Sequence, residues 1–394
     1  MPLNPDWPQI RLQFIVKNAR LQACIVELAK AELFGSLLEE SQLFFEKIIY
    51  DERHYFFKIH CRPLAYPKDI AYVLFTSGST GFPKGIVHTK KSMNAFLNWC
   101  QNEFKNYKLK RFVSIAPLNF DLSIFDVFYP VKVKGQLFVP DHNTISNTRL
   151  FIDFVSKNKI DCLYTTPSYL NLLLQTARPE KYDLSFVKLI LIAGEQLSYE
   201  LVDQLKQHFK KAIFYNLYGP TETNVCTFYK IGNETGVHVP IGKSCYPKEI
   251  RIKKNGELVY KGKLLMKAFL NEKGMHKAKT SYDTGDMVKK TGNNLVFVGR
   301  KDKMIKRNGF RIELSEIKNV LLKHSAIKNA EVISRENTIN AFVESNELLT
   351  ELELKTFCVH QLPSYMLPDR IICLDKLPLN SNHKVDAETL KKIT

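Results

Sequence analysis

Residues 72–89, YVLFTSGSTGFPKGIVHT, join an apolar run to a loop rich in glycine and hydroxyl side chains. The loop covers residues 76–81, and a single lysine, Lys84, follows it. Glycines let backbone N–H groups approach a ligand, hydroxyls donate hydrogen bonds, and lysine adds a positive charge. Because Phe82 and Pro83 separate the last glycine from the lysine, the spacing differs from the Walker pattern GxxxxGK[ST]. The stretch alone leaves two interpretations open, a phosphate-binding loop and a flexible, solvated hairpin loop.

The size and composition of the chain indicate a globular protein with more than one domain. It has 394 residues, of which 45% are hydrophobic and 25% charged. A chain of this length predicts one large body and a smaller domain. No apolar run approaches the roughly 18 residues of a membrane span, and the N-terminus lacks the features of a signal peptide. We therefore expect a cytoplasmic protein with no membrane partner.

The charge and the cysteines narrow the class of ligand. The formal net charge is +17, but the lysines are dispersed and no RNA- or DNA-binding signature is present. The excess predicts attraction to nucleotides or to an acidic protein, and no nucleic-acid partner. The eight cysteines are scattered without a CxxC pair, which favours free, buried thiols over disulfides or zinc ligands.

Strands and helices alternate through the first two thirds of the chain. Before residue 70 the pattern predicts only a sheet edge, with short strands at residues 15–16 and 24–26. Further strands are expected at residues 71–75, 85–88, 112–116, 135–139, 162–165, 187–192 and 213–217. Helices are expected at residues 93–104, 150–157, 169–176 and 199–209. This order predicts an α/β body with a largely parallel sheet, whose ligands bind beyond the strand ends.

The last third changes character twice. Short strands at residues 250–252, 257–260, 264–266 and 295–298 predict a small antiparallel sheet. From Asp302 a compact α+β unit begins, with a hairpin at Asn308-Gly309. Its helices are expected at residues 315–324 and 352–362, and its strands at 330–334, 339–343 and 371–374. The expected domains are therefore residues 1–301 and 302–394.

Six motifs in a fixed order carry a family resemblance. They are YVLFTSGSTGFPKG, FDLSIFD, NLYGPTET, YDTGD, GRKDKMIKRNGFRIELSEI and LPSYMLP…LPLNSNHKVD. Together they closely resemble the core motifs of the adenylate-forming superfamily, specifically amino-acid adenylation domains of nonribosomal peptide synthetases. The resemblance implies a large α/β body with a small antiparallel β subdomain and a small mobile C-terminal domain. It also implies a two-step ligase that uses ATP and Mg²⁺ to form an aminoacyl-adenylate and then transfers the acyl group to a thiol.

The resemblance assigns roles to the motif residues. Lys384 would bridge the attacking carboxylate and the α-phosphate, Glu222 would hold Mg²⁺, and Thr80 would share in catalysis. Asp302 matches the family hinge. The nucleotide-binding set is Thr76, Ser77, Gly78, Ser79, Thr80, Gly81, Lys84, Gly194, Asn216, Tyr218, Gly219, Thr221, Asp286 and Arg300. Taken singly, several of these residues also fit structural roles, such as a turn cap for Asp286, a core position for Tyr218 and a solvated lysine for Lys384.

Asp121 indicates which acid is activated. A carboxylate beside a substrate pocket is costly when it is unpaired, and an α-ammonium group is its natural partner. The alternative is a structural cap of a helix beginning at Leu122. The family's pocket positions fall on Asp121, Leu122, Phe125, Ser168, Leu191, Ala193, Leu217, Val225, Cys226 and Lys384. This mostly apolar lining resembles that of prolyl-adenylating enzymes, so we expect L-proline, with D-alanine as the second choice.

The acceptor thiol and two departures from the family leave alternatives. No carrier motif is found, so the resemblance implies a separate carrier protein with a phosphopantetheine arm. Two interpretations of the basic cluster Lys301, Lys303, Lys306 and Arg307 stay open, a docking surface for this carrier and a solvated basic turn. Fewer residues precede the glycine loop than in family members, and His383 replaces the glycine before Lys384. A ligase acting on coenzyme A and an inactive, shortened nucleotide-binding homologue therefore stay as rival hypotheses.

Overall fold

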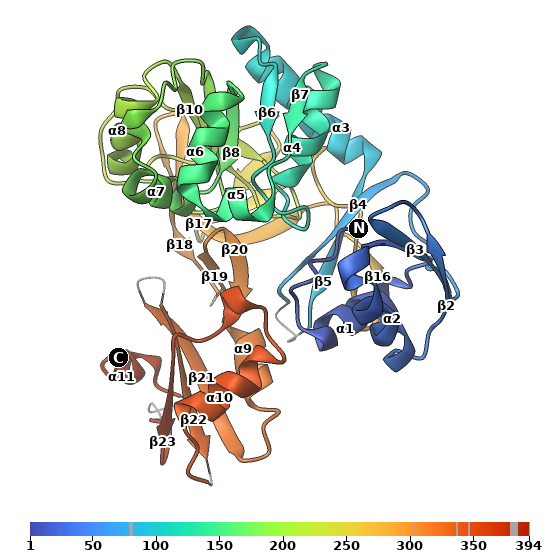
Figure 1. Ribbon diagram of the computed structural model, residues 1–394. Coiled ribbons are helices and arrows are strands. Elements are labelled where there is room, and N and C mark those ends of the chain that lie inside the picture. Colours follow the sequence, from blue (N-terminus) through green and yellow to red (C-terminus); the bar gives the residue numbers. More distant parts are fainter. Residues whose placement is uncertain (79–81, 303, 336–337, 346, 379–384, 394) are drawn as a thin grey trace.

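The computed structural model describes residues 1–78, 82–302, 304–335, 338–345, 347–378 and 385–393. Three parts are visible in Figure 1: an upper body, an N-terminal unit beside it, and a C-terminal unit below. The large body and the smaller C-terminal unit together form the mixed α/β architecture that the motifs predict. Ser79, Thr80, Gly81 and Lys384 lie outside the described residues.

The N-terminal unit packs two helices on a three-stranded sheet. Helices α1 (Gln9–Ala19) and α2 (Ala31–Glu40) cover strands in the order β1 (Ala23–Glu27), β3 (His54–His60) and β2 (Phe44–Ile49). The predicted strand at residues 15–16 is wrong, because both residues lie in α1. Leu12, Ile15, Val16 and Ala19 are all buried and recur at helical spacing, a period that two residues alone cannot reveal.

The glycine loop connects two antiparallel strands. Strands β4 (Ile70–Thr76) and β5 (Lys84–Thr89) pair with Thr76 opposite Lys84 and confirm the predicted strands around the loop. Their four-stranded sheet is completed by β15 (Ala268–Asn271) and β16 (Gly274–Lys277). The predicted strand at residues 264–266 is wrong. Leu264 and Met266 are buried in the turn before β15, and this burial accounts for the apolar pattern that suggested a strand.

A seven-stranded sheet forms the centre of the body. Its order is β12-β11-β10-β9-β8-β6-β7, and the pairs from β7 to β10 are parallel, as predicted, whereas β11 and β12 are antiparallel additions. The strands are β6 (Arg111–Val113), β7 (Gln136–Phe138), β8 (Cys162–Thr165), β9 (Leu189–Ile192), β10 (Ile213–Tyr218), β11 (Thr227–Lys230) and β12 (Lys243–Ser244).

Helices cover both faces of this sheet. One hydrophobic core joins it to α3 (Lys90–Phe104) and α4 (Ser123–Lys132). The other core joins it to α6 (Thr148–Lys157), α7 (Pro167–Thr176) and α8 (Tyr199–His208), which lie in front of the sheet in Figure 1 beside the short α5 (His142–Ser146). A sheet covered on both faces is the usual setting of parallel strands.

A third sheet brings the body to its junction with the C-terminal unit. Its strands are antiparallel in the order β13 (Ile250–Ile252), β14 (Glu257–Tyr260), β17 (Tyr282–Thr291) and β18 (Asn294–Arg300). Asp286 on β17 stands directly opposite Arg300 on β18. The pairing of these two strands therefore places two predicted nucleotide-binding residues side by side.

The C-terminal unit has its own core and one projecting hairpin. Strands β19 (Met304–Arg307) and β20 (Phe310–Glu313) reach up toward the body in Figure 1. Their turn residues, Asn308 and Gly309, both have positive φ, 51° and 80°, as a tight two-residue hairpin requires. The rest comprises α9 (Leu314–Leu321), β21 (Ile327–Arg335), β22 (Thr338–Ser345), α10 (Glu351–Val359), β23 (Arg370–Leu374) and α11 (Ala387–Leu390). The predicted boundary at Asp302 stays a prediction.

Two general expectations concern the thiols and the membrane. All eight cysteines are free thiols, and five of them are buried. Among the described residues, no helix is both long enough and apolar enough to cross a membrane.

His88, in β5, gives the fold a testable response to acid. The side chain is fully buried, with Nε2 2.9 Å from the Thr221 carbonyl oxygen and Nδ1 3.1 Å from Ser92 Oγ. Burial lowers its pKa from 6.5 to about 4, so the unfolded chain takes up the proton first as the pH falls below 6.5. Linkage then removes about 2 kcal/mol of folding free energy between pH 7 and pH 5.

We expect the melting temperature of the wild type to fall more than that of His88→Gln between these two pH values. Thermal unfolding followed by circular dichroism at pH 7 and pH 5 measures both. Equal falls in the two proteins would show that His88 is not the buried neutral group described above.

Candidate active site

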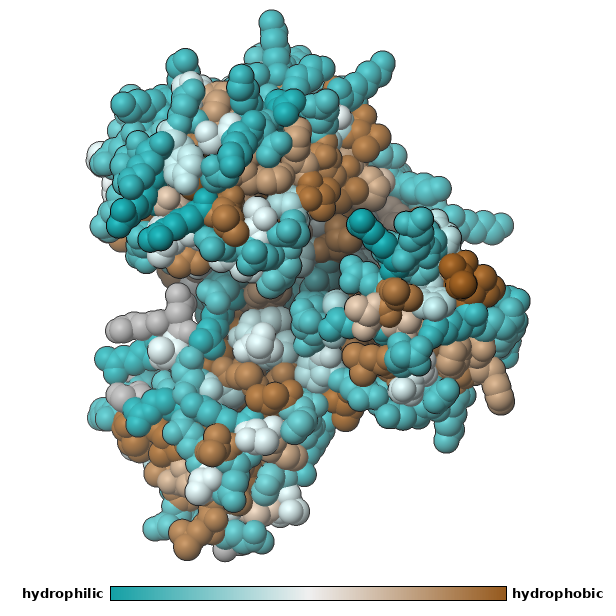
Figure 2. All heavy atoms as spheres, in the orientation of Figure 1, coloured by the Kyte–Doolittle hydropathy of each residue, from teal (hydrophilic) through white to brown (hydrophobic). Residues whose placement is uncertain are grey.

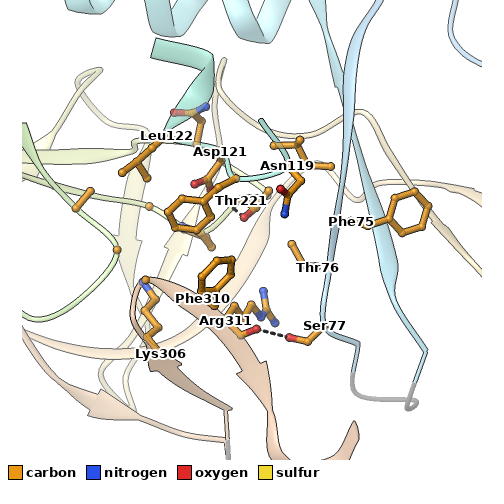
Figure 3. Close-up of a pocket in the computed structure, with 18 of the residues that line it drawn as sticks. Phe75, Thr76, Ser77, Asn119, Asp121, Leu122, Thr221, Lys306, Phe310 and Arg311 are labelled. Atoms are coloured by element: carbon orange, nitrogen blue, oxygen red, sulfur yellow. Dashed lines mark hydrogen bonds between the residues drawn. The ribbon is translucent and has the colours of Figure 1, made fainter. Parts of the chain in front are cut away.

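The hairpin of the C-terminal unit fills a pocket in the body. Gly309, Phe310 and Arg311 line this pocket together with body residues that include Asn119, Asp121 and Thr221. Figure 3 shows Phe310 and Arg311 beside these body residues. The remaining cavity is only about 70 Å³. A neighbouring cavity of about 730 Å³ shares Asp286, Arg300, Met304 and Lys306 with this pocket. In the space-filling view the surface is hollowed where the C-terminal unit meets the body (Figure 2).

Asp121 lies in the first pocket with a neutral partner. Thr221 Oγ1 donates a hydrogen bond of 2.9 Å to its carboxylate. Burial raises the pKa of Asp121, and the Thr221 hydroxyl and the charge of Lys306 offset only part of this effect. The alternative of a helix cap is wrong, because the N-cap of α4 is Leu122 and no side chain caps it. Asp121 is therefore a pocket carboxylate for which the described residues supply no ion-pair partner within 4 Å.

The other predicted substrate residues divide into three groups. Leu122, Ala193 and Val225 line the first pocket together with Asp121. Ser168 lines the larger cavity instead, where its hydroxyl donates to Glu195 Oε2 at 2.5 Å. Four residues lie wholly within the hydrophobic core on the α3–α4 side of the sheet and are absent from the linings of both cavities, namely Phe125, Leu191, Leu217 and Cys226.

Three of the predicted nucleotide-binding residues, Tyr218, Asp286 and Arg300, form one connected network. The Tyr218 hydroxyl donates to Asp286, and Asp286 forms an ion pair with Arg300. Arg300 also donates to both carboxylate oxygens of Asp302, at 2.7 and 2.8 Å. Burial disfavours charge on Asp302, but the hydrogen bonds and charge of Arg300 outweigh it and lower the pKa of that carboxyl. Tyr218, Asp286 and Arg300 all line the larger cavity, so Tyr218 is more than a core residue.

Three more nucleotide-binding candidates, Asn216, Gly194 and Gly219, line these two cavities. Asn216 lines the larger cavity, and its amide donates to the Pro240 carbonyl at 2.8 Å. Gly194 and Gly219 line the first pocket. At Gly194, whose φ is 95°, an added Cβ would lie 3.4 Å from the Cα of Gly309. A side chain at Gly194 would therefore touch the inserted hairpin, and the positive φ would strain it.

Residues at the edge of the glycine loop contact the C-terminal unit. Thr76 and Ser77 line the first pocket, and Ser77 Oγ donates to the Arg311 carbonyl at 2.8 Å (Figure 3). The Gly78 N–H donates to Glu316 Oε2 at 3.2 Å. The described edge of the loop is thus held by backbone and side-chain groups of the hairpin and α9.

The predicted metal ligand, Glu222, forms an ion pair with Arg311 in this structure. Its side chain is 1% exposed, and its two carboxylate oxygens lie 3.1 and 3.2 Å from Arg311 Nη1. Lys84 Nζ is 3.8 Å away. Burial would raise the pKa of Glu222, but the charges of Arg311 and Lys84 outweigh it and lower this pKa. No group of three or more His, Cys, Asp or Glu side chains within the described ranges is arranged to hold a metal ion by itself.

Several residues that meet at the site were not predicted. Arg311 and Glu316 belong to the quoted motif GRKDKMIKRNGFRIELSEI, but nothing local in that motif indicates their partners. The Gly309 N–H donates to Glu195 at 2.7 Å, and Phe310 stacks on Tyr365 with ring centroids 4.1 Å apart. These partners are far away in sequence, so only the folded chain reveals them.

The predicted docking cluster is not a free basic patch. Lys306 lies over the Tyr218 ring, with Nζ 5.6 Å from its centroid, and lines both cavities. Arg307 pairs with Asp369 at 2.6 Å, and Lys301 with Glu257 at 3.3 Å. Lys303 lies outside the described residues. The three described cations therefore serve contacts within the chain.

Comparison with known proteins identifies relatives of this arrangement. Residues 1–270 match the family model "AMP-binding enzyme", and residues 316–384 match "AMP-binding enzyme C-terminal domain". An L-proline–[L-prolyl-carrier protein] ligase of Pseudomonas fluorescens is 32% identical over 83% of this chain and 69% of the relative. A D-alanine–D-alanyl carrier protein ligase of Bacillus licheniformis is 28% identical over 82% of this chain and 71% of the relative.

A solved structure shares the whole fold. The Vibrio cholerae adenylation domain AlmE, in complex with glycyl-adenosine-5′-phosphate, superposes with a TM-score of 0.82. The match covers all of this chain and 83% of that one, at 22% identity. At this identity the likeness concerns the architecture alone.

Gly309 provides a test of the inserted hairpin. An added Cβ would lie 2.6 Å from Thr166 Cγ2 and 3.2 Å from the Phe120 ring, at a φ of 80°. In Gly309→Ala we expect the hairpin to leave the pocket, with at least a severalfold faster amide hydrogen exchange at residues 304–313.

Gly256→Ala is the matched control. Gly256 has a similar φ of 89° in another hairpin, where the nearest atom to an added Cβ is the flexible Met287 Cε at 3.2 Å. Unchanged exchange at residues 304–313 in Gly309→Ala would contradict the seated hairpin. Faster exchange there in both variants would contradict a local cause.

Proposed function

The chain belongs to the AMP-binding enzyme family, and on this premise we propose that it joins an amino acid, with L-proline as first choice, to AMP and then to a carrier thiol. As a ligase it would use ATP, release pyrophosphate and pass the aminoacyl group to the phosphopantetheine thiol of a separate carrier protein. The observation that carries the proposal is Asp121, a half-buried pocket carboxylate whose one hydrogen-bonded side-chain partner in the described structure is a neutral hydroxyl.

Asp121 calls for a cationic substrate group. A carboxylate removed from water is stable as an ion when a positive charge accompanies it. The secondary ammonium of proline, or a primary α-ammonium, supplies this charge. Its presence would stabilise the ionised form of the Asp121 carboxyl. Leu122, Tyr164, Ala193 and Val225 surround it with apolar or aromatic surface, which suits a small apolar side chain.

The larger cavity suits the nucleoside of ATP. Its volume of about 730 Å³ lies within the usual range of small-molecule sites. Tyr218 offers an aromatic face, and Asp286 offers a carboxylate that accepts hydrogen bonds from two ribose hydroxyls. Arg300 holds Asp286 in place from the opposite strand. The α-phosphate then falls between the larger cavity and Asp121.

Glu222 fits a magnesium site that is completed by the substrate. Mg²⁺ in nucleotide sites commonly takes one or two protein carboxylates and fills its other positions with phosphate oxygens and water. Glu222 is a lone buried carboxylate 3.8 Å from Lys84, so it meets this requirement once Arg311 withdraws. Bound there, Mg²⁺ would neutralise charge on the departing phosphates.

The proposed reaction proceeds in two steps. A carboxylate oxygen of the amino acid attacks the α-phosphorus, the new C–O–P linkage forms, and the bond to the β-phosphate breaks to release pyrophosphate. Lys384 is proposed to stabilise the charge that develops at the α-phosphorus, and Thr80 is proposed to contact the phosphates. In the second step a thiolate attacks the acyl carbon, a thioester forms, and AMP leaves.

The seated hairpin suits the state after acyl transfer, when only AMP remains, better than it suits the first step. Arg311 is paired with the Glu222 carboxylate, and Phe310 fills the pocket beside Asp121. ATP and Mg²⁺ therefore need the hairpin to withdraw, whereas AMP needs only the larger cavity. Asp302, which follows the Arg300 network, is proposed as the hinge of this movement.

D-alanine is the second candidate substrate. The relative from Bacillus licheniformis is named a D-alanine–D-alanyl carrier protein ligase. Its substrate carries the same ammonium group and a smaller apolar side chain, so Asp121 serves both candidates. The size of the pocket after hairpin withdrawal decides between them.

Amino-acid-dependent exchange of pyrophosphate into ATP tests the function. We expect L-proline to give the largest kcat/KM among the common amino acids, with D-alanine and L-alanine tested beside it. Asp121→Asn removes the charge partner of the ammonium and should lower kcat/KM about a hundredfold or more. Transfer to coenzyme A and to a phosphopantetheinylated carrier protein should be measured in parallel.

Thr221→Val is the matched control, because it removes the hydrogen bond to Asp121 but leaves the carboxylate. It should cost about tenfold or less. Absence of exchange above the level of Lys384→Ala with every amino acid would exclude the ligase and favour an inactive homologue. Exchange that is equal in Asp121→Asn and wild type would remove Asp121 from substrate recognition.

A further inference from the structure

Buried N–H donors without an acceptor gather beside the glycine loop. Within the described residues, Trp7 Nε1, Arg11 Nε and Arg11 Nη2 have no hydrogen-bond partner. Trp7 is 5% exposed and Arg11 4% exposed, and the guanidinium carbon lies 5.2 Å from the centroid of the indole ring. Such donors are rare in folded proteins and costly to bury. Three of them together indicate a place for an acceptor.

One anion already occupies part of this place. Glu316 Oε1 accepts from Arg11 Nη1 at 2.6 Å, and Glu316 Oε2 accepts from the Gly78 N–H at 3.2 Å. Both side chains of the ion pair are 3% exposed. Two oxygens on one centre, held by an arginine and a loop N–H, make the contact pattern of a bound phosphate.

The two sides of this contact belong to different parts of the chain. Trp7, Arg11 and Gly78 belong to the large N-terminal region, whereas Glu316 lies on α9 of the C-terminal unit. Arg311, three residues before α9, makes the second such contact with Glu222. When α9 withdraws, Arg11 and the Gly78 N–H lose the carboxylate of Glu316. The positive charge of Arg11 and the N–H donor of Gly78 are then left without an anion.

We propose that Arg11, with Trp7 and the Gly78 N–H, binds the terminal phosphates of ATP, which leave as pyrophosphate, and that Glu316 takes their place as an internal anion. The proposal rests on the proposed function. A phosphate at this position meets the three unpaired donors as well as the two groups that hold Glu316. Arg11 lies 67 residues before Gly78, outside all six motifs, which explains why the sequence did not indicate it.

The exchange couples phosphate binding to the position of the C-terminal unit. Carboxylate and phosphate cannot share Arg11 Nη1 and the Gly78 N–H, so each excludes the other. By linkage, a change that weakens the Glu316 contact strengthens the apparent binding of pyrophosphate, at most by the same factor. Release of pyrophosphate then lets Glu316 return, and the hairpin returns with it.

Calorimetric titration of the full chain with inorganic pyrophosphate, and separately with AMP, tests the inference. Arg11→Met should weaken pyrophosphate binding about tenfold or more and leave AMP binding within about twofold, because the larger cavity is separate from Arg11. Glu316→Gln should tighten pyrophosphate binding severalfold. Arg11→Lys, which keeps the charge, should recover part of the loss, and the double variant Arg11→Met/Glu316→Gln should bind as weakly as Arg11→Met or nearly so.

The outcomes separate this inference from the proposed function. Wild-type pyrophosphate affinity in Arg11→Met, or no tightening in Glu316→Gln, would overturn the phosphate site. An equal loss of AMP and pyrophosphate binding in both Arg11→Met and Arg11→Lys would also overturn it, since Arg11 would then only support the fold. A wild-type chain that binds AMP but not pyrophosphate would refute the inference alone, and one that binds neither would refute the nucleotide function itself.

Discussion

The ion pair between Arg311 and Glu222 is the contact on which the arrangement of the two main parts depends. Glu222 is 1% exposed, and a carboxylate so deeply buried is stable only beside positive charge. Lys84 is 3.8 Å away, whereas Arg311 reaches both carboxylate oxygens. Arg311 comes from the C-terminal hairpin, so satisfying this one buried charge places the hairpin inside the body. The ion pair therefore links the electrostatics of the site to the position of a whole domain.

The active site is divided between two parts of the chain that can exchange partners. In the proposed function the body supplies Asp121 for a substrate cation, Asp286 for a ribose and Glu222 for a metal ion or an arginine. The C-terminal unit supplies its own charged groups, Arg311 and Glu316, to the positions proposed for the metal ion and the phosphate. Each group has a substrate counterpart of like charge, Mg²⁺ for Arg311 and phosphate for Glu316. In this proposal the C-terminal unit replaces the substrate charges with its own, so that Glu222 and Arg11 each keep a buried partner of opposite charge.

Local patterns in the sequence predicted much of the fold and part of the site. Short, mostly apolar segments identified the parallel strands, and the Asn308-Gly309 pair identified the hairpin, because both signals are local. The strand at residues 15–16 was wrong because two apolar residues do not define a period, and α1 needed its four-residue face. Phe125, Leu191, Leu217 and Cys226 were expected in the substrate pocket from their motif positions. In this structure, where the hairpin fills the pocket, they lie in the core, and their contact with a substrate stays a prediction.

Contacts between distant residues could not be predicted from the sequence. Arg311 and Glu222 are 89 residues apart, Gly309 and Glu195 are 114 apart, and Arg11 and Glu316 are 305 apart. Each residue type is common in a chain with 57 basic and 40 acidic residues, so no pair stands out before folding. Charge partners across domains depend on how the domains are placed, and no local period encodes that placement.

The distance between the two parts, measured with and without ligands, tests this account most directly. Cys373 on β23 is exposed and can carry one spin label, and a cysteine introduced at the exposed Asn143 on α5 can carry the other, with Cys24 and Cys61 replaced by serine. With AMP, pulsed electron paramagnetic resonance should give the single distance of the seated hairpin. With Mg²⁺ and a non-hydrolysable ATP analogue, a second, distinct distance should become dominant. One unchanged distance under both conditions would contradict the idea that Arg311 and Glu316 give way to Mg²⁺ and phosphate.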